Sequence, residues 1–295
     1  MAQVLNWGIA VILWFQHFSP ALDMPFKLLS FLGTEDFLLL AFPLVYWCFS
    51  RQFGVQLTAL FLVSTYTVSY IKVAVNEARP FTVDSRIKML DPVNDAAFPS
   101  GHTQGAVVVW GYLATAFKRR WLTILAVVLI ILIPLSRIYL GVHYPTDVAG
   151  GYVIGGLFLL GCIYFIEPIE AWLSKRGMWW QIGLTVLVTL LLLLVFPTYD
   201  DNGITEAALI FSGGIGVALE RRFVRFSIKG TPTSQLLRLL LGLAVLMALR
   251  FGLKAAFAPF GAELTFRFIR YTIMGLWFLL GAPWVFLKLK LVEKE

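Results

Sequence analysis

Runs of apolar residues, each roughly 18 to 22 residues long, recur from about residue 36 to the end of this chain. That is the length an α-helix needs to cross the hydrocarbon core of a bilayer. Of the 295 residues, 59% are hydrophobic and only 14% are charged, too little charge to cover the surface of a water-soluble domain of this size. The sequence therefore predicts an all-α protein, a polytopic bundle of transmembrane helices.

About nine spans can be drawn on this pattern, at residues 36–50, 55–75, 101–118, 121–138, 146–166, 180–197, 203–220, 234–256 and 268–288. Residues 1–20 show no cationic start and no small-residue cleavage site, so a cleaved signal peptide is not expected there. Their apolar residues alternate with polar ones, which predicts a short helix lying in the membrane interface. We therefore expect three parts: this interfacial helix (1–30), a core (31–167) and a C-terminal extension of four spans (168–295).

The loops between the spans alternate in charge. One set carries Arg51, Lys118, Arg119, Arg120, Lys175, Arg176, Arg221, Arg222, Arg225, Lys229, Lys288, Lys290 and Lys294, and the other carries Asp84, Asp91, Asp95, Asp200, Asp201 and Glu263. By the positive-inside rule the first set and the C-terminus face the cytoplasm, and the second set faces outward across the cytoplasmic membrane. The same bias accounts for the net charge of +7, so no nucleic-acid partner is expected. Cys48 and Cys162 both fall in apolar segments and are expected to be small buried residues.

Three polar clusters lie at the outward ends of these spans. Ionisable groups in membrane segments cost free energy, so their presence there points to a functional site. They are "YIKVAVNEARPF" with Lys72, Arg79 and Pro80; "AAFPSGHTQGA" with Pro99, Ser100, Gly101 and His102; and "LSRIYLGVHYPTDVAGG" with Ser136, Arg137, His143 and Asp147. The predicted topology alone brings all three clusters to one membrane face.

The first half of this set suits an anion. Lys72, Arg79 and Arg137 are cations, and the planar guanidinium groups match phosphate oxygens. Ser100 is expected to cap the helix that follows, so that the backbone N–H of Gly101 points toward an anion from the helix N-terminus. Together they predict a pocket for a phosphoryl dianion.

The second half suits group transfer. Pro145 is well placed to start the next helix, which puts Asp147 in its first turn and His143 just before it. Asp147 can then hold one ring nitrogen of His143 and leave the other free to attack. His102 is left as the general acid for the departing oxygen.

Each residue also has a structural explanation. A cation at a span end can extend to the headgroups, Ser100 can be a cap with no further role, and His143 with Asp147 can be a polar pair that packs two helices. None of these explains why all of them gather on one side. There is no His-x3-His pair and too few carboxylates converge for a metal site, so neither a metal nor another cofactor is expected.

Lys-x6-Arg-Pro, Pro-Ser-Gly-His and Ser-Arg-x5-His-x3-Asp, in this order, resemble the three signature motifs of the type 2 phosphatidic acid phosphatase superfamily. The resemblance covers about residues 30–166 and fills every signature position, with Pro80, Pro99 and Ser136 as structural members. It implies a helical core and metal-independent phosphate release through a phosphohistidine on His143. It also implies phosphate binding by Lys72, Arg79, Ser100, Gly101 and Arg137. Vanadium haloperoxidases share the signature, but they are soluble.

The favoured function is a lipid phosphatase acting at the outer face of the membrane, because the motifs place the scissile phosphate at headgroup depth. The substrate we expect first is an isoprenoid diphosphate such as undecaprenyl diphosphate, followed by phosphatidate or phosphatidylglycerophosphate. The alternatives are a sugar-phosphate phosphatase similar in layout to glucose-6-phosphatases, a lipid phosphotransferase, or a transporter with this fold. The expected partners are the lipid substrate and the bilayer. Small residues spaced as in "GGYVIGG" favour close helix packing and leave a homodimer open.

Overall fold

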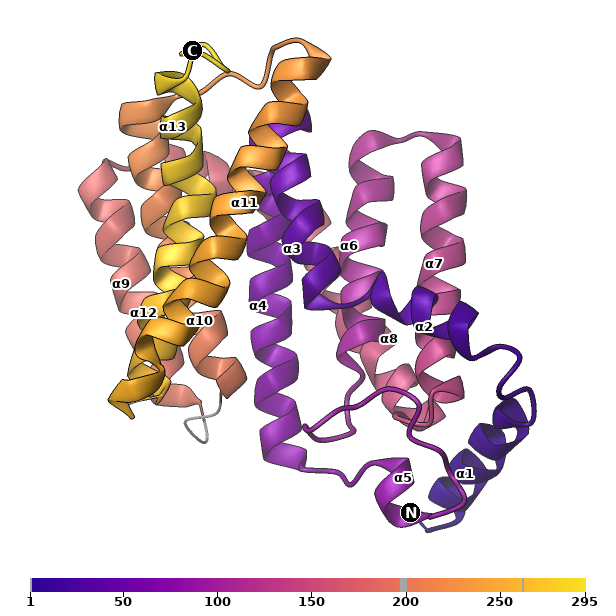
Figure 1. Cartoon of the computed structure of the whole chain (residues 1–295). Coiled ribbons are helices and arrows are strands. Elements are labelled where there is room, and N and C mark those ends of the chain that lie inside the picture. Colours follow the sequence, from indigo (N-terminus) through magenta and orange to yellow (C-terminus); the bar gives the residue numbers. More distant parts are fainter. Residues whose placement is uncertain (1, 197–200, 262) are drawn as a thin grey trace. The chain divides into compact units, whose positions relative to one another are not determined.

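A computed structural model describes residues 2–196, 201–261 and 263–295 (Figure 1). These residues form helices and no strands, apart from one isolated β-bridge between Phe226 and Lys294. The helices are α1 (Ala2–Gln16), α2 (Asp23–Phe31), α3 (Glu35–Leu44), η1 (Val45–Phe49), α4 (Arg51–Val75), α5 (Pro80–Val83), α6 (Gly101–Phe117), α7 (Arg120–Tyr139), α8 (Pro145–Ser174), α9 (Met178–Val195), α10 (Asp201–Leu219), η2 (Glu220–Val224), α11 (Pro232–Phe257), η3 (Ala258–Phe260), α12 (Glu263–Leu276), η4 (Trp277–Gly281) and α13 (Ala282–Lys288).

Each of the nine predicted segments coincides with helix in the described part of the chain. Seven stretches there are long and apolar enough to cross a membrane, and α2 with α3 and η1, bent by 48°, makes eight if the pair is one span. α6 has 17 residues and is shorter than these seven. The all-helical membrane fold is thus confirmed, while the count of nine spans stays a prediction. Asp200, one of the outward acidic residues, lies outside the described residues.

The contacts divide the chain into two compact units. Unit 1 comprises Met1–Leu38 and Thr67–Tyr164, and unit 2 comprises Leu39–Tyr66 and Phe165–Glu295. α3, α4 and α8 each run from one unit into the other, and Leu39–Tyr66 group with the C-terminal part of the chain. All three polar clusters belong to unit 1.

Within unit 1, glycines allow α8 to lie directly against α6. A Cβ atom on Gly151 would stand 2.7 Å from the carbonyl oxygen of Ser100, and one on Gly155 would stand 2.9 Å from Cβ of Val107. The Ser100 N–H also donates to the carbonyl oxygen of Asp147 (3.0 Å). The small residues of "GGYVIGG" therefore bring together the N-termini of the two helices that carry the second and third clusters.

α1 packs on the same unit by one face. Its Ile9 and Ile12 are buried against Ile138 of α7 and Tyr144. Gln16, a polar residue of this helix, is buried, and its side-chain amide donates to the carbonyl oxygen of Lys88 (2.7 Å). α1 thereby braces the loop between α5 and α6. Its position relative to a bilayer stays a prediction.

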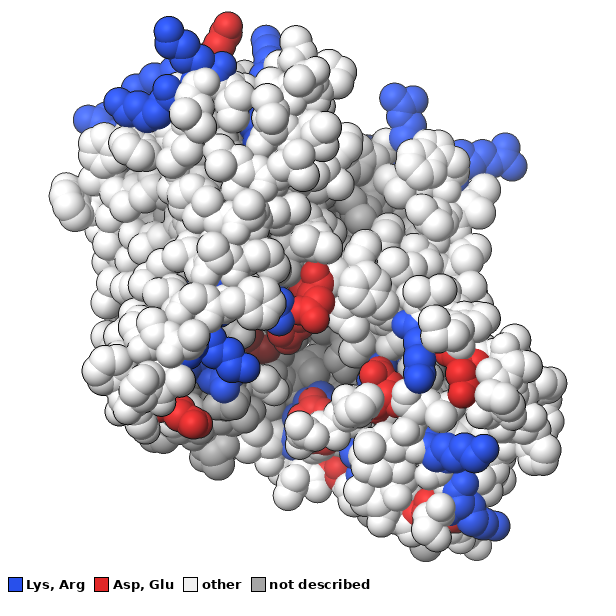
Figure 2. All heavy atoms as spheres, in the orientation of Figure 1, with Lys and Arg blue, Asp and Glu red and all other residues white. Residues whose placement is uncertain are grey.

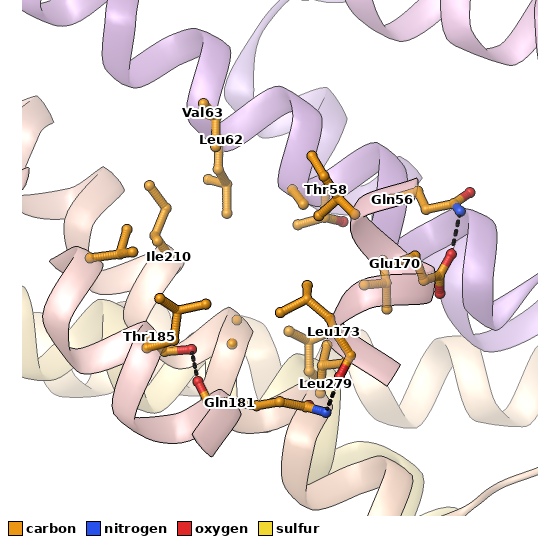
Figure 3. Close-up of a pocket in the computed structure, with 18 of the residues that line it drawn as sticks. Gln56, Thr58, Leu62, Val63, Glu170, Leu173, Gln181, Thr185, Ile210 and Leu279 are labelled. Carbon is orange, nitrogen blue, oxygen red and sulfur yellow. Dashed lines mark hydrogen bonds between the residues drawn. The ribbon is translucent and has the colours of Figure 1, made fainter. Parts of the chain in front are cut away.

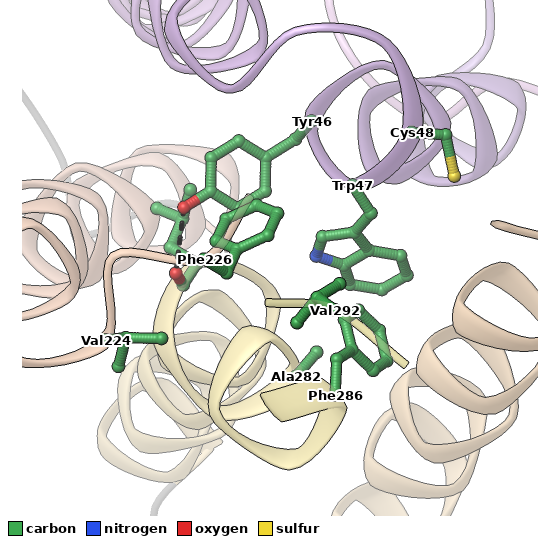
Figure 4. Packing of buried hydrophobic residues seen from close by; sticks show 9 residues of the cluster. Tyr46, Trp47, Cys48, Val224, Phe226, Ala282, Phe286 and Val292 are labelled. Atoms are coloured by element: carbon green, nitrogen blue, oxygen red, sulfur yellow. Dashed lines mark hydrogen bonds between the residues drawn. The ribbon is translucent and has the colours of Figure 1, made fainter. Parts of the chain in front are cut away.

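Unit 2 has an aromatic core (Figure 4). Trp47 is fully buried with Tyr46, Phe226 and Phe286, and its indole N–H donates to the carbonyl oxygen of Phe278 (3.0 Å). The partner for the indole N–H matters because a buried donor without a hydrogen-bond partner lowers the stability of the fold.

The two cysteines, Cys48 of unit 2 and Cys162 of unit 1, are both free and buried, as expected.

Unit 2 also contains a cavity of about 320 Å³ between α4, α8, α9 and α10 (Figure 3). Its walls are mostly aliphatic, and at one end Glu170 accepts hydrogen bonds from Gln56 (2.7 Å) and Arg221 (2.7 Å). On the face of the molecule shown in Figure 2, large areas carry neither cationic nor anionic side chains, as contact with lipid requires.

Candidate active site

Lys72 and Arg79 meet at one carboxylate. Lys72 lies in the last turn of α4, and Arg79 immediately precedes α5, where Pro80 starts the helix. The Lys72 ammonium is 2.9 Å from Oδ2 of Asp95, and the Arg79 Nη2 group donates to Oδ1 of the same carboxylate. Backbone carbonyl groups fix both cations further: Lys72 donates to Ala96, and Arg79 donates through Nε to Asp95 (2.9 Å).

Arg79 also joins the cations to His143. Its Nη1 group donates to the carbonyl oxygen of Val142 (2.6 Å) and lies 2.9 Å from Nε2 of His143. The same Nη1 group is 3.3 Å from Nδ1 of the ring. Nδ1 is also 3.1 Å from Oδ2 of Asp147, which accepts the backbone N–H of Tyr144 (2.8 Å). We assign the proton to Nδ1, because Asp147 can only accept there and Arg79 can only donate. Nε2 then carries the lone pair and is the ring nitrogen nearer to Arg79.

His143 is nearly completely buried. Burial first, and then the positive charges of Arg79 and Lys72, hold the pKa of His143 well below its usual range. The imidazole is therefore neutral at neutral pH, which is the state a nucleophile needs. The expected base-orienting arrangement of Asp147 and His143 is present in the structure, at the start of α8 as Pro145 predicts.

Ser100 caps α6 as predicted: its Oγ accepts from the backbone N–H of Thr103 (3.4 Å). Gly101 follows, and a Cβ atom there would make only an ordinary van der Waals contact with Val68, at 3.7 Å. The glycine is thus not required by packing within the protein and leaves room for a ligand beside the first N–H groups of the helix. His102 lies one residue further, and its Nε2 is buried with no hydrogen-bond partner among the described residues.

Arg137, near the C-terminal end of α7, is 1% exposed. Its Nη1 group donates to Ser30 of α2 and to Asp91 of the loop between α5 and α6. Its Nε is buried without a partner in the described part of the chain. The backbone N–H of Val142 donates to the carbonyl oxygen of Arg137 (3.2 Å), which ties this cation to the His143 loop.

The remaining motif residues shape the backbone. Pro80 is the first residue of α5, Pro99 precedes the α6 cap, and the Ser136 hydroxyl donates to the carbonyl oxygen of Ile133 within α7 (2.6 Å). The structure thus gathers in unit 1 every residue for which we expect a role in phosphate binding or catalysis. Those roles stay predictions.

Sequence analysis missed four residues that touch this set. Asp95 and Asp91 were used only as topology markers, and Ser30 and Gly33 were not considered. A Cβ atom on Gly33 would stand 3.0 Å from the ring of His102. The available signal was electrostatic: buried cations need anionic partners, and the loop that separates the first two clusters supplies acidic residues.

The arrangement combines three cations, a helix N-terminus and a neutral imidazole held by a carboxylate. It also includes a second histidine, His102, whose Nε2 has no hydrogen-bond partner among the described residues. Cations and N–H groups can stabilise the oxygens of a phosphoryl group as it is transferred. The imidazole can accept that group, and the second histidine can exchange a proton with the leaving oxygen. The geometry therefore suits phosphoryl transfer to a histidine.

Known proteins are similar to this chain in sequence and in fold. A protein-family model described as "PAP2 superfamily" matches residues 53–170. A second family model, described as "PAP2 superfamily phosphatase, transmembrane extension", matches residues 204–294. An undecaprenyl-diphosphatase of Sulfolobus acidocaldarius is 32% identical over 111 residues, which are 36% of this chain and 52% of that protein. Lipid phosphate phosphatase delta of Arabidopsis thaliana is 25% identical over 276 residues, 83% of this chain and 65% of that protein.

Among solved structures, a transmembrane PAP2 type phosphatidylglycerolphosphate phosphatase from Bacillus subtilis shares the fold. The TM-score is 0.50 at 23% identity, and the match covers 57% of this chain and 89% of that chain. The chain spans about half the length of the first curated relatives it matches. The two superfamily models together account for most of the sequence, and the three motifs stand in order within the first of them. The chain is a multi-pass membrane protein that belongs to the PAP2 superfamily.

Proposed function

We propose that this protein is a phosphatase that hydrolyses a phosphorylated lipid in the membrane. The observation that carries the proposal is the line of contacts from Asp147 through His143 to Arg79, a cation that we expect to bind phosphate. Curated relatives include undecaprenyl-diphosphatases, a phosphatidylglycerophosphatase B and a lipid phosphate phosphatase, which supports a phosphorylated lipid as substrate.

In the first step Nε2 of His143 attacks phosphorus, and the bond between phosphorus and the leaving oxygen breaks. His102, which carries a proton on both ring nitrogens at the start of this step, gives one of them to that oxygen. Asp147 stabilises the positive charge that develops on the ring. In the second step His102 takes a proton from water, whose oxygen attacks the phosphohistidine and releases inorganic phosphate. Protein cations and the α6 N-terminus bind the phosphoryl oxygens in both steps, so the mechanism requires no metal ion.

For the substrate we favour an isoprenoid diphosphate such as undecaprenyl diphosphate, with phosphatidate or phosphatidylglycerophosphate next. Two undecaprenyl-diphosphatases are among the similar proteins, at 32% and 35% identity over short regions. An amphiphile also suits a site that is carried by membrane helices, since its tail can remain in the hydrocarbon region while its phosphate reaches the polar clusters.

The proposal is tested by phosphate release from purified protein in detergent with EDTA. The substrates are undecaprenyl diphosphate, phosphatidate, phosphatidylglycerophosphate and glucose 6-phosphate, with His143→Ala as the blank. Release from one lipid well above the others supports the proposal. Turnover of glucose 6-phosphate alone would replace the lipid by a sugar phosphate, and no release from any substrate would contradict a phosphatase.

We further propose that the site faces outward from the cytoplasmic membrane and that the C-terminus is cytoplasmic, from the charge bias of the loops. Arg86, in the loop between α5 and α6, is exposed. Arg120, the first residue of α7 and thus at the end of that helix far from Arg137, is exposed as well. In a cysteine-free background, Arg86→Cys should react with a membrane-impermeant thiol reagent in intact cells, and Arg120→Cys should react only after lysis. The reverse pattern would invert the orientation.

A further inference from the structure

The phosphate-binding cations of this site are already paired with carboxylates. Asp95 contacts Lys72 (2.9 Å) and Arg79, and Asp91 contacts Arg137. Both aspartates lie in the loop between α5 and α6, and neither belongs to the three motifs. Each cation that is expected to bind the phosphoryl group therefore carries an anion of the protein itself.

The exposure of the partners differs sharply. The side chains of Lys72, Arg79 and Arg137 are 9%, 6% and 1% exposed, whereas those of Asp95 and Asp91 are 40% and 35% exposed. The carboxylates are thus the more accessible members of these ion pairs, so a phosphoryl group can reach the carboxylates more readily than the buried cations. A carboxylate and a phosphoryl group present similar oxygens to a guanidinium group, so they compete for the same donors.

The third aspartate of this loop behaves differently. Asp84 pairs with Arg86 (2.6 Å), two residues away, and that arginine is 70% exposed. The position of the loop alone therefore does not force its acidic residues onto the motif cations.

The cations do not depend on the carboxylates alone for their positions. Lys72 also donates to the carbonyl oxygen of Ala96, and Arg79 also donates to those of Asp95 and Val142. These backbone contacts can hold both side chains in place when the Asp95 carboxylate moves away. Arg137 likewise keeps Ser30 as a second partner.

The carboxylate of Asp95 is ionised at neutral pH. Burial alone would raise its pKa, but the charges of Lys72 and Arg79 outweigh that effect and hold the pKa below its usual range. The competitor for the site is thus a full negative charge.

We propose that Asp95 and Asp91 are internal anions that occupy the phosphate-binding cations of the free protein and are displaced by the incoming phosphoryl group. They set the affinity of the site for phosphate, and their return to the cations promotes release of inorganic phosphate. This inference rests on the proposed phosphatase function and assigns these two residues a role in substrate and product binding.

The test compares Asp95→Asn and Asp91→Asn with Asp84→Asn as the matched control. Asparagine keeps the size of the side chain and removes the competing charge. For each variant we measure kcat and KM, the inhibition constant of inorganic phosphate, and the rise in Tm caused by inorganic phosphate. The last readout requires no turnover.

Removing a half-exposed competing ion should lower both KM and the phosphate inhibition constant by about 3- to 10-fold in each site variant. In these variants kcat should stay within about threefold of the wild-type value, or fall because product release is slower. The rise in Tm caused by inorganic phosphate should be larger than in wild type. The control variant Asp84→Asn should match wild type in every readout.

Unchanged or weaker phosphate binding in the two variants would overturn the inference, because the aspartates would then be supports and not competitors. Should one variant fail to fold, the other decides, since Asp95 and Asp91 contact different cations. A wild-type protein that neither turns over nor binds phosphate would contradict the proposed function itself, which keeps the two failures distinct.

Discussion

Replacing Asp147 by Asn removes a negative charge behind His143 and keeps the shape of the side chain. Oδ2 of Asp147 accepts from His143 (3.1 Å) and from the backbone N–H of Tyr144 (2.8 Å), so the amide oxygen of Asn must take that position. The new NH2 group then lies where Oδ1 is buried without a partner among the described residues. The proton on Nδ1 of His143 keeps its acceptor, and the ring keeps its orientation.

The size of the effect follows from the charge that develops on the ring during attack. Exchanging a charged for a neutral acceptor weakens a buried hydrogen bond by about 1 to 1.5 kcal/mol. The lost attraction between a carboxylate and a positive ring about 4 Å apart is at most ~4 kcal/mol at an effective dielectric constant of about 20. Together these bounds predict a fall in kcat of roughly 10- to 1000-fold, with KM nearly unchanged because the free site binds phosphate as before.

The assay is phosphate release by the purified variant under saturating lipid substrate, beside wild type and His143→Ala. Thermal unfolding is recorded in parallel, since an unsatisfied NH2 group costs about 1 to 3 kcal/mol of stability. A folded Asp147→Asn protein with kcat within about threefold of wild type would refute the assigned role of this carboxylate. So would a change confined to KM.

Three further outcomes are expected. His102→Ala should slow substrates with a poor alcohol leaving group far more than an aryl phosphate, measured as kcat for a matched pair, and an equal loss would indicate a structural role. Gly151→Ala should lower Tm and activity, because its Cβ atom would collide with α6, whereas Gly156→Ala, with nothing within 4 Å, should do neither; equal Tm values would contradict the packing argument. Because the pKa of His143 is lowered, its neutral form persists as the pH falls, and kcat/KM corrected for substrate ionisation should not drop as the pH passes about 6.5. An acid limb centred there would show an unperturbed nucleophile.

The helices could be predicted from sequence because apolar length is a local property. The starts of α6 and α8 were also predictable, since Ser100 and Pro145 are local signals for a helix N-terminus. α8 nevertheless continues to Ser174, beyond the predicted end at residue 166, and in this last part Glu170 accepts hydrogen bonds from Gln52 and Gln56 of α4. Those partners are more than 100 residues away in sequence.

The candidate site was predictable as a set of residues but not as a network. Motif spacing does not determine the path of the loop between α5 and α6, so nothing in the sequence placed Asp95 on Lys72 and Arg79. The same holds for Ser30, whose helix reaches Arg137 only through tertiary packing. Long-range pairing of a loop has no sequence period from which it can be inferred.

The central claim is that His143 carries the phosphoryl group during turnover. Purified protein is mixed with substrate labelled with ³²P in the transferred phosphoryl group, in the presence of EDTA, and quenched in alkali within the first turnover. Peptide mass spectrometry then locates the label. The account predicts a phosphohistidine at His143, stable to alkali and lost in acid, which forms at the rate of leaving-group release and is absent from His143→Ala. Release of phosphate with no labelled protein, or a label on another residue, would contradict it.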